Sequence, residues 1–306
     1  MASYVVRRLL WVVIILWGVS LLTFLVAYAV PADPARLYAG ARASGDVVRS
    51  IRHQMGLDRP IYVQYLDYMG HVVRGDFGYS FHLQSNVLPI ILGHFPATAQ
   101  LAVAGIVVEM LLGLPLGVLA ALHRNSWVDR LALLLSLLSI SAPTFVVGVV
   151  LLYILGYVVP IFPLGGYGGI NNLILPALAL GFGGAGWYAR TLRSTMLDVL
   201  GMDYVRTARA KGVRALGIAL RHVVRNALGP IVTNLGLDMA YFLGGVLVIE
   251  TVFGWPGVGL LGYEAIGYQD VPMLMGTVLF SALIIVLMNL IIDISYGFLD
   301  PRVRYE

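Results

Sequence analysis

The 306-residue sequence contains no cysteine and has few charged residues. Without cysteine, the chain has no disulfide, no thiolate metal site and no cysteine nucleophile. Charged residues make up 12% of the chain and hydrophobic residues 59%, whereas a soluble domain has about 25% charged and about 45–50% apolar residues. The mean hydropathy is +0.86. This shortage of charge indicates that lipid covers much of the surface.

Sequence motifs of catalysis and nucleotide binding are also missing. The chain has no G-x-x-x-x-G-K-[ST] phosphate-binding loop, no H-E-x-x-H and no G-x-S-x-G. Its six histidines show no metal-ligand spacing, and no basic stripe interleaved with aromatic residues indicates nucleic acid binding. We therefore expect no catalytic residue, no metal, no cofactor of its own and no nucleic acid partner.

Long apolar runs predict an all-α polytopic membrane protein with about six transmembrane helices, because about 20 apolar residues cross a bilayer. Pro143 is the expected kink of the third helix. The expected spans are about 9–30, 96–122, 131–160, 172–190, 230–252 and 273–293. Together they form one transmembrane domain over residues 1–306.

The distribution of basic residues predicts that both termini lie on the cytoplasmic side. With that orientation, 14 of the 20 basic residues fall in inner segments, and the other six lie in the long outer segment 31–95. The two short outer connections carry none. An alternative is a cleaved secretory signal, since Arg7 and Arg8 precede an apolar run that ends in Ala27-Tyr28-Ala29. The run is longer than such signals usually are, and further apolar spans follow it.

The outer segment 31–95 is expected to form a helical cap on the membrane surface. Ser44 is positioned to cap a helix that ends near Gly56, and Pro60 to start another that ends near Gly75. Asn86 is positioned to cap a short third helix. The second helix would present Tyr62, Leu66, Met69 and Val73 on one face. The cap is either a docking surface for a substrate-delivering protein or an uninvolved loop.

The longest inner segment, 197–229, is predicted to fold into two helical pieces that separate at Lys211 and Gly212. Glycine adopts the left-handed conformation that often ends a helix, so Gly212 suits the position after the first piece. Such a helical pair can transmit force to a partner. Its many arginines are equally able to bind anionic lipid, and both roles remain open.

Ionisable residues inside apolar spans are functional candidates, because their insertion into lipid is costly. Glu109 and Asp238 qualify by position, and Asp238 shares its span with Asn234 and Tyr241. A structural hydrogen bond is the alternative role for Asp238, and the direction in which Glu109 faces stays open.

Near the inner end of the last span, Asn289 and Asp293 lie one helical turn apart and are expected to serve as an interhelical hydrogen-bonding pair. Glu250 is expected at the outer interface. The sequence Gly254-Trp255-Pro256-Gly257-Val258-Gly259 breaks any helix. There Trp255, Pro256 and Gly257 form either an outer gate, a contact for a delivery protein or a plain connector.

Several stretches resemble the permease subunits of ABC importers. DYVRTARAKG (203–212) followed by LRHVVRNALGP (220–230) is similar to the EAA loop of that family. Further similarity covers RRLL, GVSLLTF, GLDRPIYVQYLDY, RGDFGYSF, ETVFGWPGVG and NLIIDISYGFLDPRVRY, and so nearly the whole chain. The GLDRP stretch resembles the dipeptide/oligopeptide (DppB/OppB-like) class. PADP replaces the common PGDP at Ala32.

The resemblance implies a type I ABC importer permease fold and a place in the cytoplasmic membrane of a bacterium or archaeon. It implies a second homologous permease, two cytoplasmic subunits that bind ATP and Mg and hydrolyse the ATP, and an extracytoplasmic substrate-binding protein. It also implies that a coupling segment inserts into the ATPase. That segment comprises Asp203, Tyr204, Arg206, Thr207, Ala208, Arg209, Ala210, Lys211 and Gly212.

The resemblance further implies that the fifth span lines the translocation path, so Asp238, Asn234, Tyr241 and Glu109 are the candidate path residues. The expected cargo is a di- or oligopeptide, and nickel chelates, glutathione and oligosaccharides are alternatives on the same scaffold. A self-sufficient secondary transporter is a more remote alternative, because it would favour internal repeats, which the sequence does not show. An intramembrane scaffold that transports no substrate is the third functional hypothesis.

Overall fold

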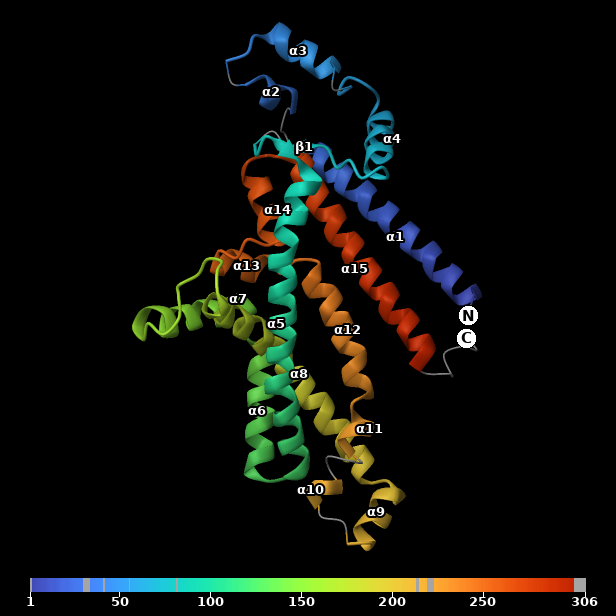
Figure 1. Ribbon diagram of the computed structural model, residues 1–306, viewed down its shortest axis with the longest axis vertical. Coiled ribbons are helices and arrows are strands. Elements are labelled where there is room, and N and C mark those ends of the chain that lie inside the picture. Colours follow the sequence, from blue (N-terminus) through green and yellow to red (C-terminus); the bar gives the residue numbers. More distant parts are fainter. Residues whose placement is uncertain are drawn as a thin grey trace. The chain divides into compact units, whose positions relative to one another are not determined.

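The computed structural model consists almost entirely of helices (Figure 1). It describes residues 2–29, 34–40, 42–54, 56–80, 82–212, 215–218 and 223–299. The helices group into two compact units, and α5 contributes residues to both. The first unit comprises Met1–Thr98, Leu243–Leu247 and Pro256–Glu306, and the second comprises Ala99–Phe242 and Val248–Trp255.

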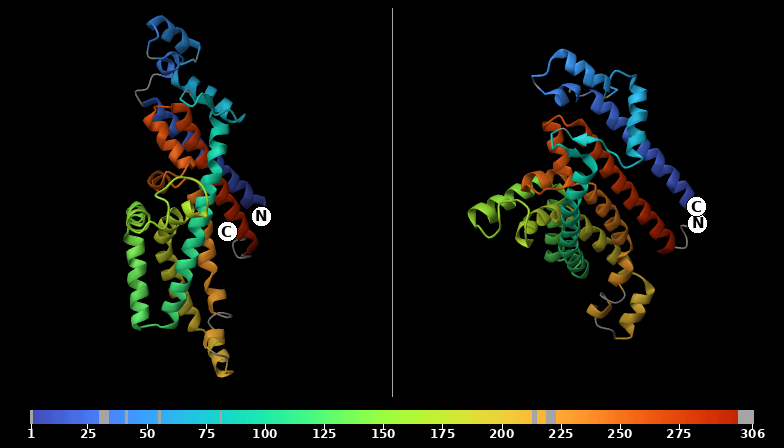
Figure 2. Two further views of the ribbon diagram at one scale, coloured as in Figure 1. Left: turned by 60° about the vertical axis from the view of Figure 1, so that its left-hand side comes forward. Right: turned by 45° about the horizontal axis from the view of Figure 1, so that its top comes forward.

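The first unit pairs the first and last long helices of the chain. Helix α1 packs along α15 (Figure 1, Figure 2), and Arg8 of α1 forms an ion pair with Asp293 of α15 at 3.0 Å. The elements of this unit are α1 (Ala2–Ala29), α2 (Pro34–Ala39), α3 (Gly45–Gln54), α4 (Ile61–Val72), β1 (Tyr79–Ser80), β2 (Ser85–Asn86), the start of α5 (Val87–Leu122), α14 (Val258–Gly267) and α15 (Val271–Leu299). The two-residue antiparallel pair β1 and β2 is a small departure from the predicted all-α fold.

The second unit is built around α8. Helices α6 and α7 pack against α8, and the small helices α9 to α11 follow its carboxyl end in sequence. The elements are the rest of α5, α6 (Trp127–Ser141), α7 (Thr144–Leu151), the π-helical segment η1 (Leu152–Val158), α8 (Ile170–Leu200), α9 (Asp203–Ala210), α10 (Ala215–Ile218), α11 (Arg225–Ala227), α12 (Gly229–Leu243) and α13 (Leu247–Phe253).

The apolar helices agree with a polytopic membrane protein. Among the described residues, three helical stretches are long and apolar enough to cross a membrane, namely Val6–Ala27, Val87–Leu122 and Val271–Asp293. Two bent helix pairs raise that number to five if each pair is one span. The remaining predicted span, 172–190, lies within α8, which is long enough but richer in glycine and polar residues.

The third predicted span, 131–160, is not one gently kinked helix. The chain breaks at Pro143, as the sequence predicts, but α6 and the helix that follows it meet at 102°. The fifth span, 230–252, is likewise bent by 57° between α12 and α13. Proline lacks the amide hydrogen that would continue the helix, which explains the position of the first break.

A helix begins directly after Asn86, as predicted, but it is not the short separate helix that was expected. It is α5, which runs unbroken from Val87 to Leu122. Gly56 and Gly75 end their helices with positive φ angles of 66° and 85°, as predicted. Helix α4 turns Tyr65 and Tyr68 toward Phe24 of α1.

A row of small residues lets α5 pack closely on α8. Gly105, Gly113 and Gly117 lie one or more turns apart on one face of α5. A Cβ atom at Gly117 would lie 2.7 Å from the backbone oxygen of Ala189, and one at Gly113 would lie 2.7 Å from that of Ala185. Small residues of this kind allow helix backbones to approach each other in membranes.

Replacing Gly117 with valine should therefore destabilise the protein by about 1–3 kcal/mol, since overpacking forces the backbones apart. Gly93 lies on the same helix, but a Cβ atom added there would have no other atom within 4 Å, so Gly93→Val is the matched control. Thermal unfolding of both purified variants in detergent checks the prediction. Equal melting temperatures for the two variants would contradict the close α5–α8 contact.

Candidate functional site

Helix α9 has one buried side chain, Val205, and its other described side chains are exposed. Val205 has 0% exposure and belongs to an apolar cluster with Met196, Val199 and Ile218. Asn226 donates a hydrogen bond of 2.8 Å to the Tyr204 hydroxyl. This cluster attaches α9 to the carboxyl end of α8, while the other side of α9 remains available to a partner.

The predicted coupling residues fall on this helix and on the turn after it. Asp203, Tyr204, Arg206 and Thr207 are exposed, and so are the following Ala210, Lys211 and Gly212. Ala208 and Arg209 lie within α9, and the placement of their side chains is outside the described part of the chain. Arg206 pairs with Asp203 at 3.5 Å on the surface, and such pairs contribute little stability.

Gly212 takes the left-handed conformation predicted for it, with φ +77°. It follows α9 directly, and Lys211 closes the helix with a hydrogen bond of 3.1 Å to the carbonyl of Thr207. The second predicted helical piece is represented by α10 and α11. Residues 213–214 and 219–222, between these pieces, lie outside the described part.

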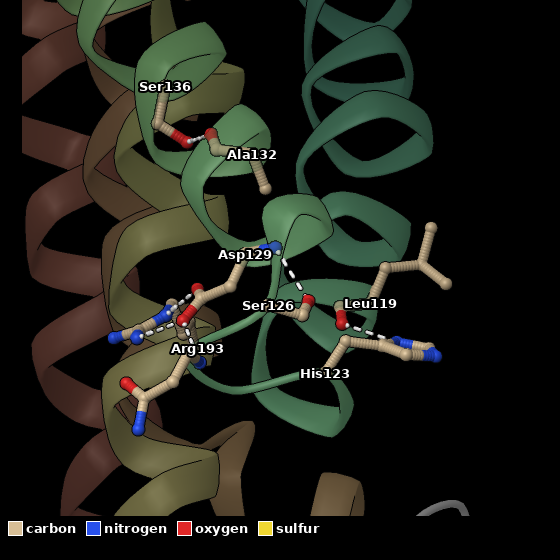
Figure 3. A network of polar contacts seen from close by, with 8 residues as sticks. Leu119, His123, Ser126, Asp129, Ala132, Ser136 and Arg193 are labelled. Atoms are coloured by element: carbon tan, nitrogen blue, oxygen red, sulfur yellow. Dashed lines mark hydrogen bonds and ion pairs between the residues drawn. The ribbon is translucent and has the colours of Figure 1, made fainter.

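A two-pronged ion pair secures the beginning of α6 to α8 (Figure 3). Arg193 Nε lies 2.6 Å from Asp129 Oδ1, and Arg193 Nη2 lies 2.7 Å from Asp129 Oδ2. Asp129 also accepts the backbone amide of Asn125 at 2.9 Å, while Ser126 caps α6 by accepting the amide of Asp129. In the sequence, Arg193 counts only among the basic residues that predict the membrane orientation. The sequence pattern does not predict the ion pair with Asp129.

The candidate path residues lie on two helices of the second unit, α5 and α12. The Tyr188 hydroxyl of α8 donates a hydrogen bond to Asp238 Oδ2. Glu109 is 2% exposed, and its Oε2 has no hydrogen-bond partner. A Cβ atom at Gly184 would overlap the Glu109 carboxyl group, so that carboxyl occupies the space that the glycine leaves. The sequence pattern predicts both acids as candidates but neither Gly184 nor Tyr188.

Asn234 and Tyr241 share a face of α12 with Asp238, since they lie four residues before it and three after it. Asn234 donates its side-chain amide to the carbonyl of Pro230 at 2.9 Å, and Tyr241 is exposed. A stripe with an amide, a carboxyl and a phenol is unsuited to a lipid-facing surface.

At the inner end of α15, Asp293 does form an interhelical contact, but its partner is not the predicted Asn289. Asp293 pairs with Arg8 of α1 rather than with Asn289, and the buried Asn289 Oδ1 has no hydrogen-bond partner. Residues one turn apart on a helix can pair with each other, but here the carboxylate pairs with the charged guanidinium of the neighbouring helix α1. The ion pair is thus the interhelical contact.

The helix break at Gly254–Gly257 is present, and it separates α13 from α14. The Trp255 side chain is 1% exposed and packs edge-on against Tyr167 at a ring distance of 4.9 Å. A buried ring offers little surface to another protein in this conformation, and the gate or delivery-protein contact at Trp255, Pro256 and Gly257 stays a prediction. Pro256 follows it, and Gly257 is the N-cap of α14.

The described residues include no group of three or more histidine, aspartate or glutamate side chains that could hold a metal ion.

Residues 113–305 match the family described as the binding-protein-dependent transport system inner membrane component, and residues 1–102 match its N-terminal family. The glutathione transport system permease protein GsiC of Salmonella typhimurium is 40% identical over 306 residues, which cover 100% of both chains. GsiC of Escherichia coli K12 is 39% identical over the same length.

Solved structures show the same fold. A chain of the inward-facing MetNI methionine ABC transporter superimposes with a TM-score of 0.56 and 18% identity, covering 69% of this chain and 96% of that one. A second crystal form gives a TM-score of 0.59 and 19% identity, with 70% and 98% coverage.

The family models match nearly the whole sequence, and one relative is 40% identical over its full length. These matches assign the chain to a family. The chain belongs to the binding-protein-dependent transport system inner membrane components, and it is a multi-pass permease subunit of an ABC importer in the cytoplasmic membrane.

Proposed function

We propose that this permease imports a short peptide, with glutathione as the first candidate, after delivery by an extracytoplasmic binding protein. The full-length similarity to two GsiC proteins, whose names specify glutathione transport, is the observation on which the substrate depends. Glutathione is itself a tripeptide, so this proposal narrows the peptide class that the sequence predicts. The DppB/OppB-like subclass remains part of the proposal.

Coupling to ATP hydrolysis is assigned to α9 and Gly212. The exposed residues from Asp203 to Gly212 are anchored by the buried Val205, so a force applied to α9 reaches α8 through a packed cluster. ATP, Mg and the hydrolytic residues would belong to two cytoplasmic subunits. A second permease would complete the path along which Asp238, Asn234, Tyr241 and Glu109 lie.

The exposed face of α4 is a candidate surface for the binding protein. Tyr62, Leu66 and Val73 are all exposed there, while Tyr65 and Tyr68 turn toward Phe24. This arrangement leaves an apolar face of the outer segment without a partner among the described residues of this chain. An apolar patch of this kind on an outer helix suits protein docking better than solvent.

Reconstitution of the complete complex tests the proposal. Vesicles containing both permeases, both ATPases and the loaded binding protein should accumulate labelled glutathione only when ATP is supplied, and an excess of a nickel chelate or an oligosaccharide should not compete. A hydrolysis-deficient ATPase is the control. Uptake by the lone chain under an ion gradient would contradict the coupling, and exclusive uptake of another ligand would contradict the substrate.

A further inference from the structure

Glu109 is a buried acid without a counterion among the described residues. Its side chain lies in the glycine-rich contact between α5 and α8, is 2% exposed, and leaves Oε2 without a hydrogen-bond partner. Burial of an unpaired polar group costs free energy unless a partner satisfies it. A carboxyl group in such a place within a transmembrane helix indicates a function that supplies the partner.

Asp238 is a second acid, and only one of its two carboxyl oxygens accepts a hydrogen bond from the described residues. Tyr188 donates to its Oδ2, and within the described residues no donor is found for its Oδ1. The side chain is partly exposed and lies on the polar stripe of α12 with Asn234 and Tyr241. One oxygen is therefore fixed by the phenol, and the other remains available from the side of the stripe.

Helix α8 brings the two acids to one place. Gly184 lies against the Glu109 carboxyl and Tyr188 binds Asp238, and these two α8 residues are one helical turn apart on the same face. The titratable groups gathered here are Glu109 from α5, Tyr188 from α8 and Asp238 from α12, and among the described residues no basic side chain pairs with either acid.

Two carboxyl groups with unfilled acceptor positions suit a ligand that has only donors. A primary ammonium carries three N–H donors and no acceptor, and hydrogen bonds between charged groups are the strong ones. Every peptide with a free amino end carries that group. The stripe on α12 offers the accessible approach, and Glu109 supplies a further buried oxygen without a hydrogen-bond partner.

We propose that Asp238, with Glu109 behind it, binds the primary ammonium group of the peptide during its passage, and that Tyr188 is the positioning residue for the Asp238 carboxyl. This inference rests on the proposed function and adds to it the chemical group that the path recognises.

Equilibrium binding to the complete membrane complex, embedded in lipid nanodiscs without the binding protein, tests the site. Labelled glutathione should bind about tenfold more tightly than N-acetylglutathione, because N-acetylglutathione lacks the ammonium and cannot form the charge-assisted hydrogen bond. Asp238→Asn should remove this difference by weakening glutathione alone. Leu237→Ala, at the neighbouring exposed position of α12, should leave the difference intact.

Tyr188→Phe provides a second variant in case Asp238→Asn fails to assemble. It should reduce the preference for glutathione by about threefold, since the Asp238 carboxyl loses its orienting donor. Equal binding of the two ligands to the unmodified complex, or equal losses for both ligands in the variants, would overturn the site. ATP-driven glutathione uptake by the unmodified complex in vesicles, supplied with its loaded binding protein, would show that the proposed function survives this failure.

Discussion

Replacement of Gly212 with valine should reduce ATP-driven uptake at least about tenfold, while the protein still inserts into the membrane. Gly212 has φ +77°, and a Cβ atom added there would have no atom of the described residues within 4 Å. The substitution therefore meets no steric obstacle and acts through the backbone alone. A β-branched residue in the left-handed region raises the conformational energy by about 1–3 kcal/mol. The backbone after α9 will therefore adopt a different conformation. Uptake into vesicles, with the amount of complex quantified, measures the effect.

Asparagine at position 212 is the matched control for this experiment. Asparagine tolerates the left-handed region far better than valine, so Gly212→Asn should retain most of the uptake. Stimulation of ATP hydrolysis by the loaded binding protein should follow the same order. Normal uptake by Gly212→Val would show that the conformation of this turn is irrelevant to coupling.

Local sequence patterns predicted those features of the fold that local chemistry determines. Gly56, Gly75 and Gly212 each adopt the positive φ expected at a helix end, since only glycine takes this conformation without a Cβ penalty. Pro143 marks the break between α6 and α7 for a similar reason. The apolar runs predicted most of the long helices, because length and hydropathy are sufficient for that purpose.

Contacts between distant segments could not be predicted in the same way. Asp129 and Arg193 are 64 residues apart, and nothing in the spacing of either helix pairs them. Asp293 pairs with Arg8 at the other end of the chain, whereas the local pattern favoured Asn289. The four-residue spacing of Gly105, Glu109 and Gly113 is a signal that was available and that predicts a face of α5 in close contact with another helix.

The ion pair between Asp129 and Arg193 joins two helices of the second unit. It binds the start of α6 to α8 (Figure 3), and α8 leads directly into the segment that carries α9. A displacement of α9 that reaches α8 will therefore also move α6. Sequence alone could not show this mechanical link, because it depends on the packing of α6 against α8.

Arg193→Met should lower the free energy of unfolding by about 3–5 kcal/mol, which is the usual cost of leaving a buried charge without its partner. The side chain of Asp129 is 4% exposed and that of Arg193 20%, so water replaces the guanidinium only in part. The backbone amide of Asn125 remains as a donor to Asp129, but it carries no full charge. Denaturant unfolding of the purified protein in detergent measures the change.

The double variant Asp129→Asn with Arg193→Met distinguishes a lost ion pair from lost packing. Asparagine keeps an acceptor for the amide of Asn125 and removes the charge, so the double variant should recover most of the stability that Arg193→Met loses. Arg190→Met, at an exposed position three residues earlier on α8, should change stability by no more than about 0.5 kcal/mol. A double variant no more stable than Arg193→Met would mean that the arginine stem, rather than its charge, holds α6 against α8.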